Sequence, residues 1–222
     1  MLSPLPQTLP TLERLALIST VVLLFALPAR AQDRYVELLF GTGSLDDGGG
    51  LTIEDARFGT LADTDYDSGL AFGLAFGTRL GKSWQLEGDY IYRRNELSDT
   101  VFSDGLQIDE GDYASVVISA SLQYLFRPDQ NVRPYLGVGF GWVQEVDIDF
   151  VVDCQENSFE TDDFVLQLQA GVEWDLSERW SLSAEARWLE VSGLTMEAEE
   201  GNGTVEADYQ PWSLLVGLGW RF

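Results

Sequence analysis

The chain ends in the stretch Trp212-Ser213-Leu214-Leu215-Val216-Gly217-Leu218-Gly219-Trp220-Arg221-Phe222. Every even position of this stretch holds a large apolar side chain, and most odd positions are small or polar: Ser213, Gly217, Gly219 and Arg221. A period of two is the period of a β-strand, in which successive side chains point to opposite faces. The stretch therefore predicts a strand with one apolar face.

The same alternation recurs along the chain in eight segments of about 7 to 14 residues, as expected for strands. They are 34–42, 69–80, 84–94, 113–126, 133–144, 164–176, 180–189 and 212–222. In the cores of these segments the even positions are apolar, with Gly88 as the exception. Eight such strands predict an all-β protein, but alternation alone fits a soluble sandwich as well as a membrane barrel.

The connections between the segments alternate in length. Those at 43–68, 95–112, 145–163 and 190–211 are long, whereas those at 81–83, 127–132 and 177–179 are short. Long outer loops and tight periplasmic turns are typical of transmembrane β-barrels. This pattern favours the barrel and predicts that both ends of the barrel domain lie in the periplasm.

Aromatic residues on the apolar face gather near the ends of the segments. Toward the short turns lie Trp84, Phe126, Trp174, Trp180 and Phe222. Toward the long loops lie Tyr92, Trp142, Phe164, Trp188 and Trp212. Two such rings are expected where a barrel crosses the two membrane interfaces, and the core of a soluble sandwich does not need them.

An apolar run at 15–27 is followed by Ala29-Arg30-Ala31. This combination is typical of a secretory signal peptide that is cleaved before Gln32. We expect residues 1–31 to be the signal peptide and residues 32–222 to be the barrel domain. A buried core helix is the alternative for the run, and Pro28 at its end argues against it.

The chain is strongly acidic, with 37 Asp and Glu against 13 Lys and Arg and a formal net charge of −24. Nucleic-acid binding is not expected, because it depends on cations that neutralise phosphates. The four long connections hold 7, 6, 8 and 6 acidic residues in order. The single Cys154 leaves no internal disulfide.

The sequences of two stretches resemble those of a known protein family. They are Arg133-Pro134-Tyr135-Leu136-Gly137-Val138-Gly139-Phe140-Gly141 and the stretch 170–182, AGVEWDLSERWSL. Both are similar to the outer-membrane β-barrel family that includes the OmpA transmembrane domain and opacity-type surface proteins. The resemblance implies an eight-stranded antiparallel up-and-down transmembrane β-barrel in the cell outer membrane. The strand that ends on Trp220 and Phe222 also resembles the signal by which the barrel-assembly machinery recognises its clients.

In an eight-stranded barrel the odd positions point into an interior only wide enough for side chains to fill. Isolated charges there are costly, so we expect a paired polar network that plugs the barrel. Its predicted members are Glu37, Arg79, Glu87, Asp89, Arg93, Arg133, Glu173, Glu185 and Arg187. We expect a structural or surface-interaction role, and the alternative is a narrow channel for ions or small solutes.

An enzyme is not expected, because the chain has no His, the usual general base near neutral pH. The sequence shows no cofactor motif. Two acidic clusters offer oxygen ligands for Ca²⁺ or Mg²⁺: Asp63, Asp65, Asp67 and Asp147, Asp149, Asp153. A solvated surface is the simpler interpretation, and the alternative is that divalent ions link these loops to lipopolysaccharide phosphates. Outer-membrane lipids are the other expected partners, and any surface ligand is unspecified.

Overall fold

The computed structural model describes residues 34–44, 52–54, 61–66, 68–102, 110–152, 155–198 and 204–222. Side chains are described for 34–44, 68–96, 114–144, 163–191 and 210–222. The predicted signal peptide, 1–31, lies outside the described residues. Over the described part of the chain, no helix is long and apolar enough to cross a bilayer.

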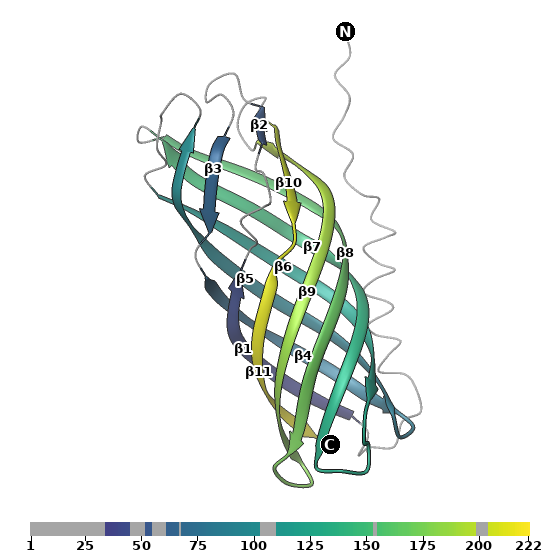
Figure 1. Ribbon diagram of the computed structural model, residues 1–222. Helices are drawn as coiled ribbons and strands as arrows, with labels where there is room; N and C mark the ends of the chain where they lie inside the picture. The colour runs from purple at the N-terminus through teal and green to yellow at the C-terminus, as the bar shows by residue number, and fades with distance from the viewer. Residues whose placement is uncertain are drawn as a thin grey trace.

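Eight long strands form one closed antiparallel sheet (Figure 1). They are β1 (Arg34–Ser44), β4 (Gly69–Leu80), β5 (Trp84–Phe102), β6 (Glu110–Leu125), β7 (Val132–Val152), β8 (Gln155–Asp175), β9 (Trp180–Ala198) and β11 (Trp212–Arg221). Each pairs with the next, and β11 pairs with both β9 and β1. The predicted eight-stranded up-and-down barrel is confirmed.

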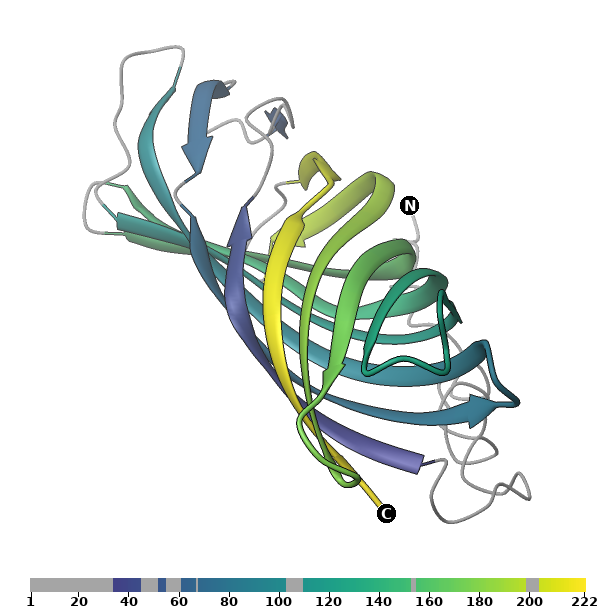
Figure 2. The same cartoon turned by 60° about the horizontal axis from the view of Figure 1, so that its bottom comes forward.

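The two ends of the chain's barrel domain close the sheet. Figure 2 shows β1 in purple beside β11 in yellow, and their register runs from Tyr35 opposite Arg221 to Ser44 opposite Trp212. Closure leaves no strand edge, so the backbone N–H and C=O groups of the wall bond to one another. The sheet can therefore contact lipid along its whole circumference.

The apolar face of the sheet points outward. Large apolar side chains at even positions are exposed on all eight strands, as at Phe40 (58%), Phe140 (60%) and Leu214 (62%). A soluble sandwich would bury these residues, and so large an exposed apolar surface indicates contact with lipid. Aromatic rings meet near both ends of the wall: Trp84 and Tyr124 at 5.0 Å, and Trp188 and Trp212 at 6.4 Å between centroids.

Several strands are longer than the alternation predicted. β5 continues to Phe102 rather than ending at 94, and β8 begins at Gln155 rather than at 164. Three short strands, β2 (Thr52–Glu54), β3 (Leu61–Tyr66) and β10 (Thr204–Tyr209), lie in regions predicted to be loops. The alternation reports only the part of a strand that faces lipid, whereas backbone pairing continues beyond it without requiring apolar residues.

A charge placed on the outer face should be costly in proportion to its depth. Val138 and Val132 both face outward on β7 and are 52% and 46% exposed. Val132 begins the strand beside Trp174, whereas Val138 lies in the middle of the alternating segment 133–144. We expect Val138→Arg to lower the free energy of unfolding by about 2–4 kcal/mol and Val132→Arg by about 0–1 kcal/mol. Urea titration of the protein in lipid vesicles measures both, and equal losses would contradict this orientation in the membrane.

Candidate functional site in the barrel interior

The structure places all nine residues of the predicted polar network on the inward face of the barrel. Six of them are buried, and Glu37, Arg79 and Glu173 are half-buried. Their odd numbering explains this placement, because the even positions of the same strands face outward. They do not form one continuous set, however, and they divide into a central group, a cluster at the end with the short turns, and two further residues, Arg93 and Glu37.

Arg187 on β9 is the cation of the central group. Its guanidinium lies 3.1 Å from Glu87 Oε1, 2.8 Å from Asp89 Oδ2 and 2.5 Å from Glu185 Oε1. The side chains of these four residues, which we call the central group, are at most 4% exposed. One cation thus holds three carboxyl groups in a site from which water is largely excluded.

Two tyrosines complete the coordination of the central group. Tyr35 donates a hydrogen bond to Glu87 Oε2 (2.5 Å), and Tyr135 donates one to Glu185 Oε2 (2.6 Å). Tyr35 on β1 and Glu87 on β5 lie on either side of β4. In the same way, Tyr135 on β7 and Glu185 on β9 lie on either side of β8. Arg187 therefore joins two similar units on opposite sides of the barrel.

A glycine on the shared strand makes room for each tyrosine ring. A Cβ atom built on Gly171 of β8 would lie 2.5 Å from Tyr135 Cζ and 2.8 Å from the carbonyl oxygen of Ala184. Gly77 of β4 lies against the Tyr35 ring in the same way. Only glycine allows the rings to lie this close to the wall.

Amides and hydroxyls extend the central group to further strands. Gln123 on β6 donates to Glu87 Oε1 (2.9 Å) and accepts from Gln85 (2.9 Å). Ser119 on β6 lies 2.8 Å from Asp89 Oδ1 and 3.0 Å from the Oε1 of Gln167 on β8. Side-chain hydrogen bonds around the central group thus cross-link β1, β5, β6, β7, β8 and β9.

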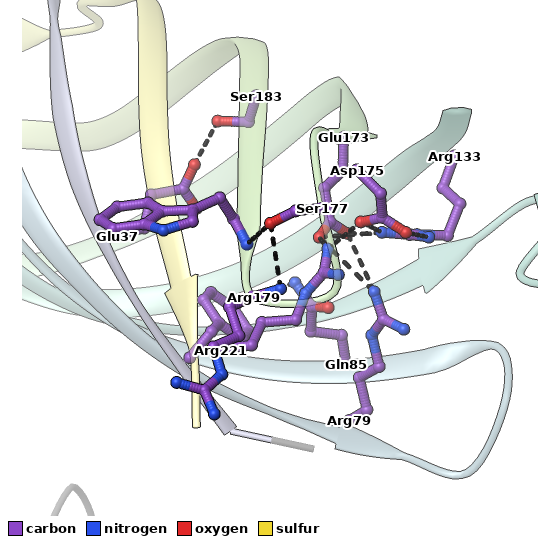
Figure 3. A network of polar contacts seen from close by, with 12 residues as sticks. Glu37, Arg79, Gln85, Arg133, Glu173, Asp175, Ser177, Arg179, Ser183 and Arg221 are labelled. Atoms are coloured by element: carbon purple, nitrogen blue, oxygen red, sulfur yellow. Dashed lines mark hydrogen bonds and ion pairs between the residues drawn. The ribbon is translucent and has the colours of Figure 1, made fainter. Parts of the chain in front are cut away.

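A second cluster lies at the end of the barrel that carries the short turns. Figure 3 shows the three guanidinium groups of Arg79, Arg133 and Arg221 around the carboxylates of Glu173 and Asp175. Arg133 lies 3.1 Å from Glu173 and also bonds Asp175 with both of its terminal nitrogens. Three cations against two anions give this cluster the opposite charge balance from the central group.

The remaining predicted residues lie apart from these clusters. Arg93 lies on the other side of the central group, toward the long connections, and its Nε donates to Ser213 Oγ (2.8 Å). Glu37 accepts a hydrogen bond from Ser183 (Figure 3). The predicted network left out Tyr35, Tyr135, Asp175 and Arg221, although the odd numbering of these residues was a usable signal.

Sequence reasoning also missed an apolar layer inside the barrel. On four strands it consists of Leu39, Ile91, Val117 and Val143. On the other four strands it consists of Val165, Leu189, Leu215 and Ala71. Each of these eight residues, which we call the apolar collar, is at most 2% exposed. The signal was an apolar residue at one odd position of every strand, against the alternation.

On β5 and β9 the apolar collar follows the central group toward the long connections, whereas Leu215 of β11 lies beside the central group, paired with Glu185. Arg187 contacts Asp89 across the barrel, and the next inward positions on the same two strands are Leu189 and Ile91. Val117 is paired with Ile91, and Leu39 contacts Ile91. On β5 the inward positions on either side of the collar are the polar Asp89 and Arg93, whereas on β9 the buried Val191 extends the apolar surface beyond Leu189.

The predicted metal ligands are not described. The side chains of Asp63, Asp65, Asp67, Asp147, Asp149 and Asp153 lie outside the described residues. Within the described ranges, no group of three or more His, Cys, Asp or Glu could hold a metal ion. The two residues of the predicted assembly signal, Trp220 and Phe222, face outward and stack with their rings 5.2 Å apart.

Residues 17–222 match the family model described as outer membrane protein beta-barrel domain. Outer membrane protein AlkL of Ectopseudomonas oleovorans is 29% identical over 121 residues, covering 52% of this chain and 49% of AlkL, so the match spans about half the length of that relative. The crystal structure of OprG from Pseudomonas aeruginosa aligns with a TM-score of 0.61 at 15% identity, covering 87% of this chain and 98% of OprG. The solid-state NMR structure of AlkL in DMPC bilayers aligns with a TM-score of 0.54 at 19% identity, covering 88% and 94%. At these identities the two structures support the fold alone.

Removing the central cation should destabilise the barrel. Arg187→Met leaves three carboxyl groups buried without their partner, so we expect a loss of about 3–5 kcal/mol in the free energy of unfolding. Lys82→Met is the control, because it removes one cation whose side chain is 78% exposed and pairs only with the exposed Asp129. It should cost at most about 1 kcal/mol. Urea unfolding in lipid vesicles measures both, and a tolerant Arg187→Met variant would show that the central group does not hold the barrel together.

A methyl group should be rejected where a tyrosine lies against the wall. Gly171→Ala brings a Cβ against the Tyr135 ring, so we expect it to lower stability by about 1–3 kcal/mol through overpacking. Gly88→Ala is the matched control, because its Cβ would meet only the carbonyl oxygen of Ser119 at 3.7 Å, an ordinary contact. The difference between the two unfolding midpoints is the measurement, and no difference would mean that the tyrosine has room to move.

Proposed function

Because the chain belongs to the outer membrane protein beta-barrel domain family, we propose that it is a structural or surface-interaction component of the outer membrane, with a plugged interior and acidic extracellular loops. The protein is located in the cell outer membrane. The observation that carries the proposal is the central group, in which a single buried guanidinium is bound to carboxyl groups from two opposite strands.

The geometry of the central group supports a plug rather than a pore. Arg187 reaches from β9 to β5, and the tyrosines from β1 and β7 fasten the glutamates on either side. Breaking such buried ion pairs without replacement is costly, so the side chains have little freedom to move aside. Solutes therefore have no ready path through the middle of the barrel.

If the lumen is plugged, the function of the protein depends on its exposed surfaces, in particular on the long connections. The four long connections contain 27 acidic residues and a single basic one, Arg57. In the proposed orientation these connections face the outside and the short turns face the periplasm. The outer surface would then be strongly anionic, and divalent ions could link it to lipopolysaccharide phosphates.

Two further partners belong to this proposal. Outer-membrane lipids would contact the exposed apolar face, and the barrel-assembly machinery would engage the last strand, where Trp220 and Phe222 present adjacent rings. Catalysis forms no part of the proposal, because the chain has no His, the usual general base near neutral pH.

A narrow channel is the second candidate. The specific observation that favours it is the partly exposed polar lining of the cluster at the short turns, where Arg79 is 23% exposed and Asp175 is 20% exposed. A path for small ions would need to continue from there through the central group.

Two experiments test the two candidate functions separately: EDTA resistance of cells tests the surface role, and arabinose swelling of proteoliposomes tests the channel. In a strain that lacks the gene, we expect the wild-type protein to restore resistance to a chelator such as EDTA. A variant with the eight acidic residues of 145–163 changed to their amides should insert but restore it poorly. Proteoliposomes with wild-type protein should not swell in isosmotic arabinose, since the interior is filled.

Heat-modifiable migration on a detergent gel serves as the folding control for each variant. Full restoration of EDTA resistance by the amide variant would contradict the surface role. Swelling in arabinose would favour the channel instead.

A further inference from the structure

The barrel interior changes character along its axis. From the short-turn end, the inward side chains form first the cluster of Arg79, Arg133 and Arg221 with Glu173 and Asp175, then the central group, and then the apolar collar. On three strands the next inward position beyond the collar is polar again, at Arg93, Ser115 and Ser213, whereas on β9 it is the apolar Val191. A purely structural plug could be polar throughout, so the apolar layer needs its own explanation.

We propose that the apolar collar is a dry seal that stops water and ions from crossing the lumen, so that water reaches the central group only from the short-turn end. The inference rests on the proposed plugged interior and deepens it, because it assigns the barrier to one layer. Narrow apolar constrictions exclude water, since a water molecule inside them gives up its hydrogen bonds.

Four collar residues pack against one another on one side of the barrel. Leu39, Ala71, Ile91 and Leu215 form one contact cluster together with Ala75, which lies outside the collar, and none of the five is more than 2% exposed. Gly73 allows this packing, because a Cβ there would lie 2.7 Å from Ile91 Cγ1. On the far side of the barrel, Leu189 is 0% exposed directly above Arg187.

Side-chain exposure supports access from one end only. In the cluster at the short turns, Arg79 is 23% exposed and Arg221 is 12% exposed. In the central group, immediately below the collar, Arg187 is 1% exposed and Asp89 is 0% exposed. Water is thus progressively excluded toward the collar, and the low dielectric there strengthens the ion pairs of Arg187.

Two residues on opposite strands offer a test that separates polarity from size. Ile91 lies on β5 and Leu189 on β9, four strands apart in the ring of eight. The Ile91→Ser/Leu189→Ser variant opens the collar and adds hydroxyl groups. The Ile91→Ala/Leu189→Ala variant removes similar volume but leaves an apolar void, and such voids stay dry.

Stopped-flow light scattering of proteoliposomes after an osmotic upshift measures water permeability. We expect the wild-type protein and the alanine variant to match empty vesicles, and the serine variant to raise permeability several-fold. Heat-modifiable migration confirms that each variant is folded. Should the serine variant not fold, the comparison of wild-type protein with empty vesicles still decides, because a seal requires the two to be equal.

Water permeability above that of empty vesicles for the wild-type protein would overturn the seal, and so would equal permeability of the folded serine and alanine variants. Neither result would refute the proposed function, because a barrel that passes water can still exclude arabinose. Conversely, arabinose swelling by wild-type protein would refute the plugged interior itself.

Discussion

Closure of the sheet by β11 is the constraint on which the rest of the structure depends. In lipid, an unpaired strand edge would leave a row of N–H and C=O groups without partners, at a cost of several kcal/mol for each group. β11 removes both edges by pairing with β1 on one side and β9 on the other. Once the ring is closed, each residue of the wall must point either to lipid or to the interior.

The interior then has a fixed and small cross-section that side chains must fill. Tyr35 and Tyr135 supply bulk and a hydroxyl, and they fit because Gly77 and Gly171 leave the wall free beside them. Arg187 supplies the charge that joins the two tyrosine–glutamate units. The large tyrosine side chains thus fit against glycines on the neighbouring strands, and the ion pairs of Arg187 hold the two tyrosine–glutamate units in position.

The apolar collar and the central group depend on each other. Ion pairs between Arg187 and its carboxyl partners are strong only where water is scarce, and the collar limits water from one side. In return, the central group cross-links opposite strands directly below the collar, which helps keep Ile91 and Leu189 in place. The central group and the apolar collar therefore act together to close the interior of the barrel.

The sequence by itself determined the number of barrel strands, the side of the wall to which each side chain points, and the two girdles of aromatic residues. Lipid on one side of the wall imposes an alternation with a period of two, which is directly visible in the sequence. Because charge is excluded from the lipid face, the sequence also predicted nine charged residues of the interior, although not Asp175 or Arg221. It could not show that Arg187 meets Glu87 and Asp89 from the opposite wall, because such contacts depend on barrel diameter and strand stagger. The collar was visible only as scattered exceptions such as Ile91 and Leu189, and the tertiary structure alone brings these residues together as buried side chains inside the barrel. The full lengths of β5 and β8 were likewise decided by backbone pairing beyond the lipid, where side-chain alternation carries no information.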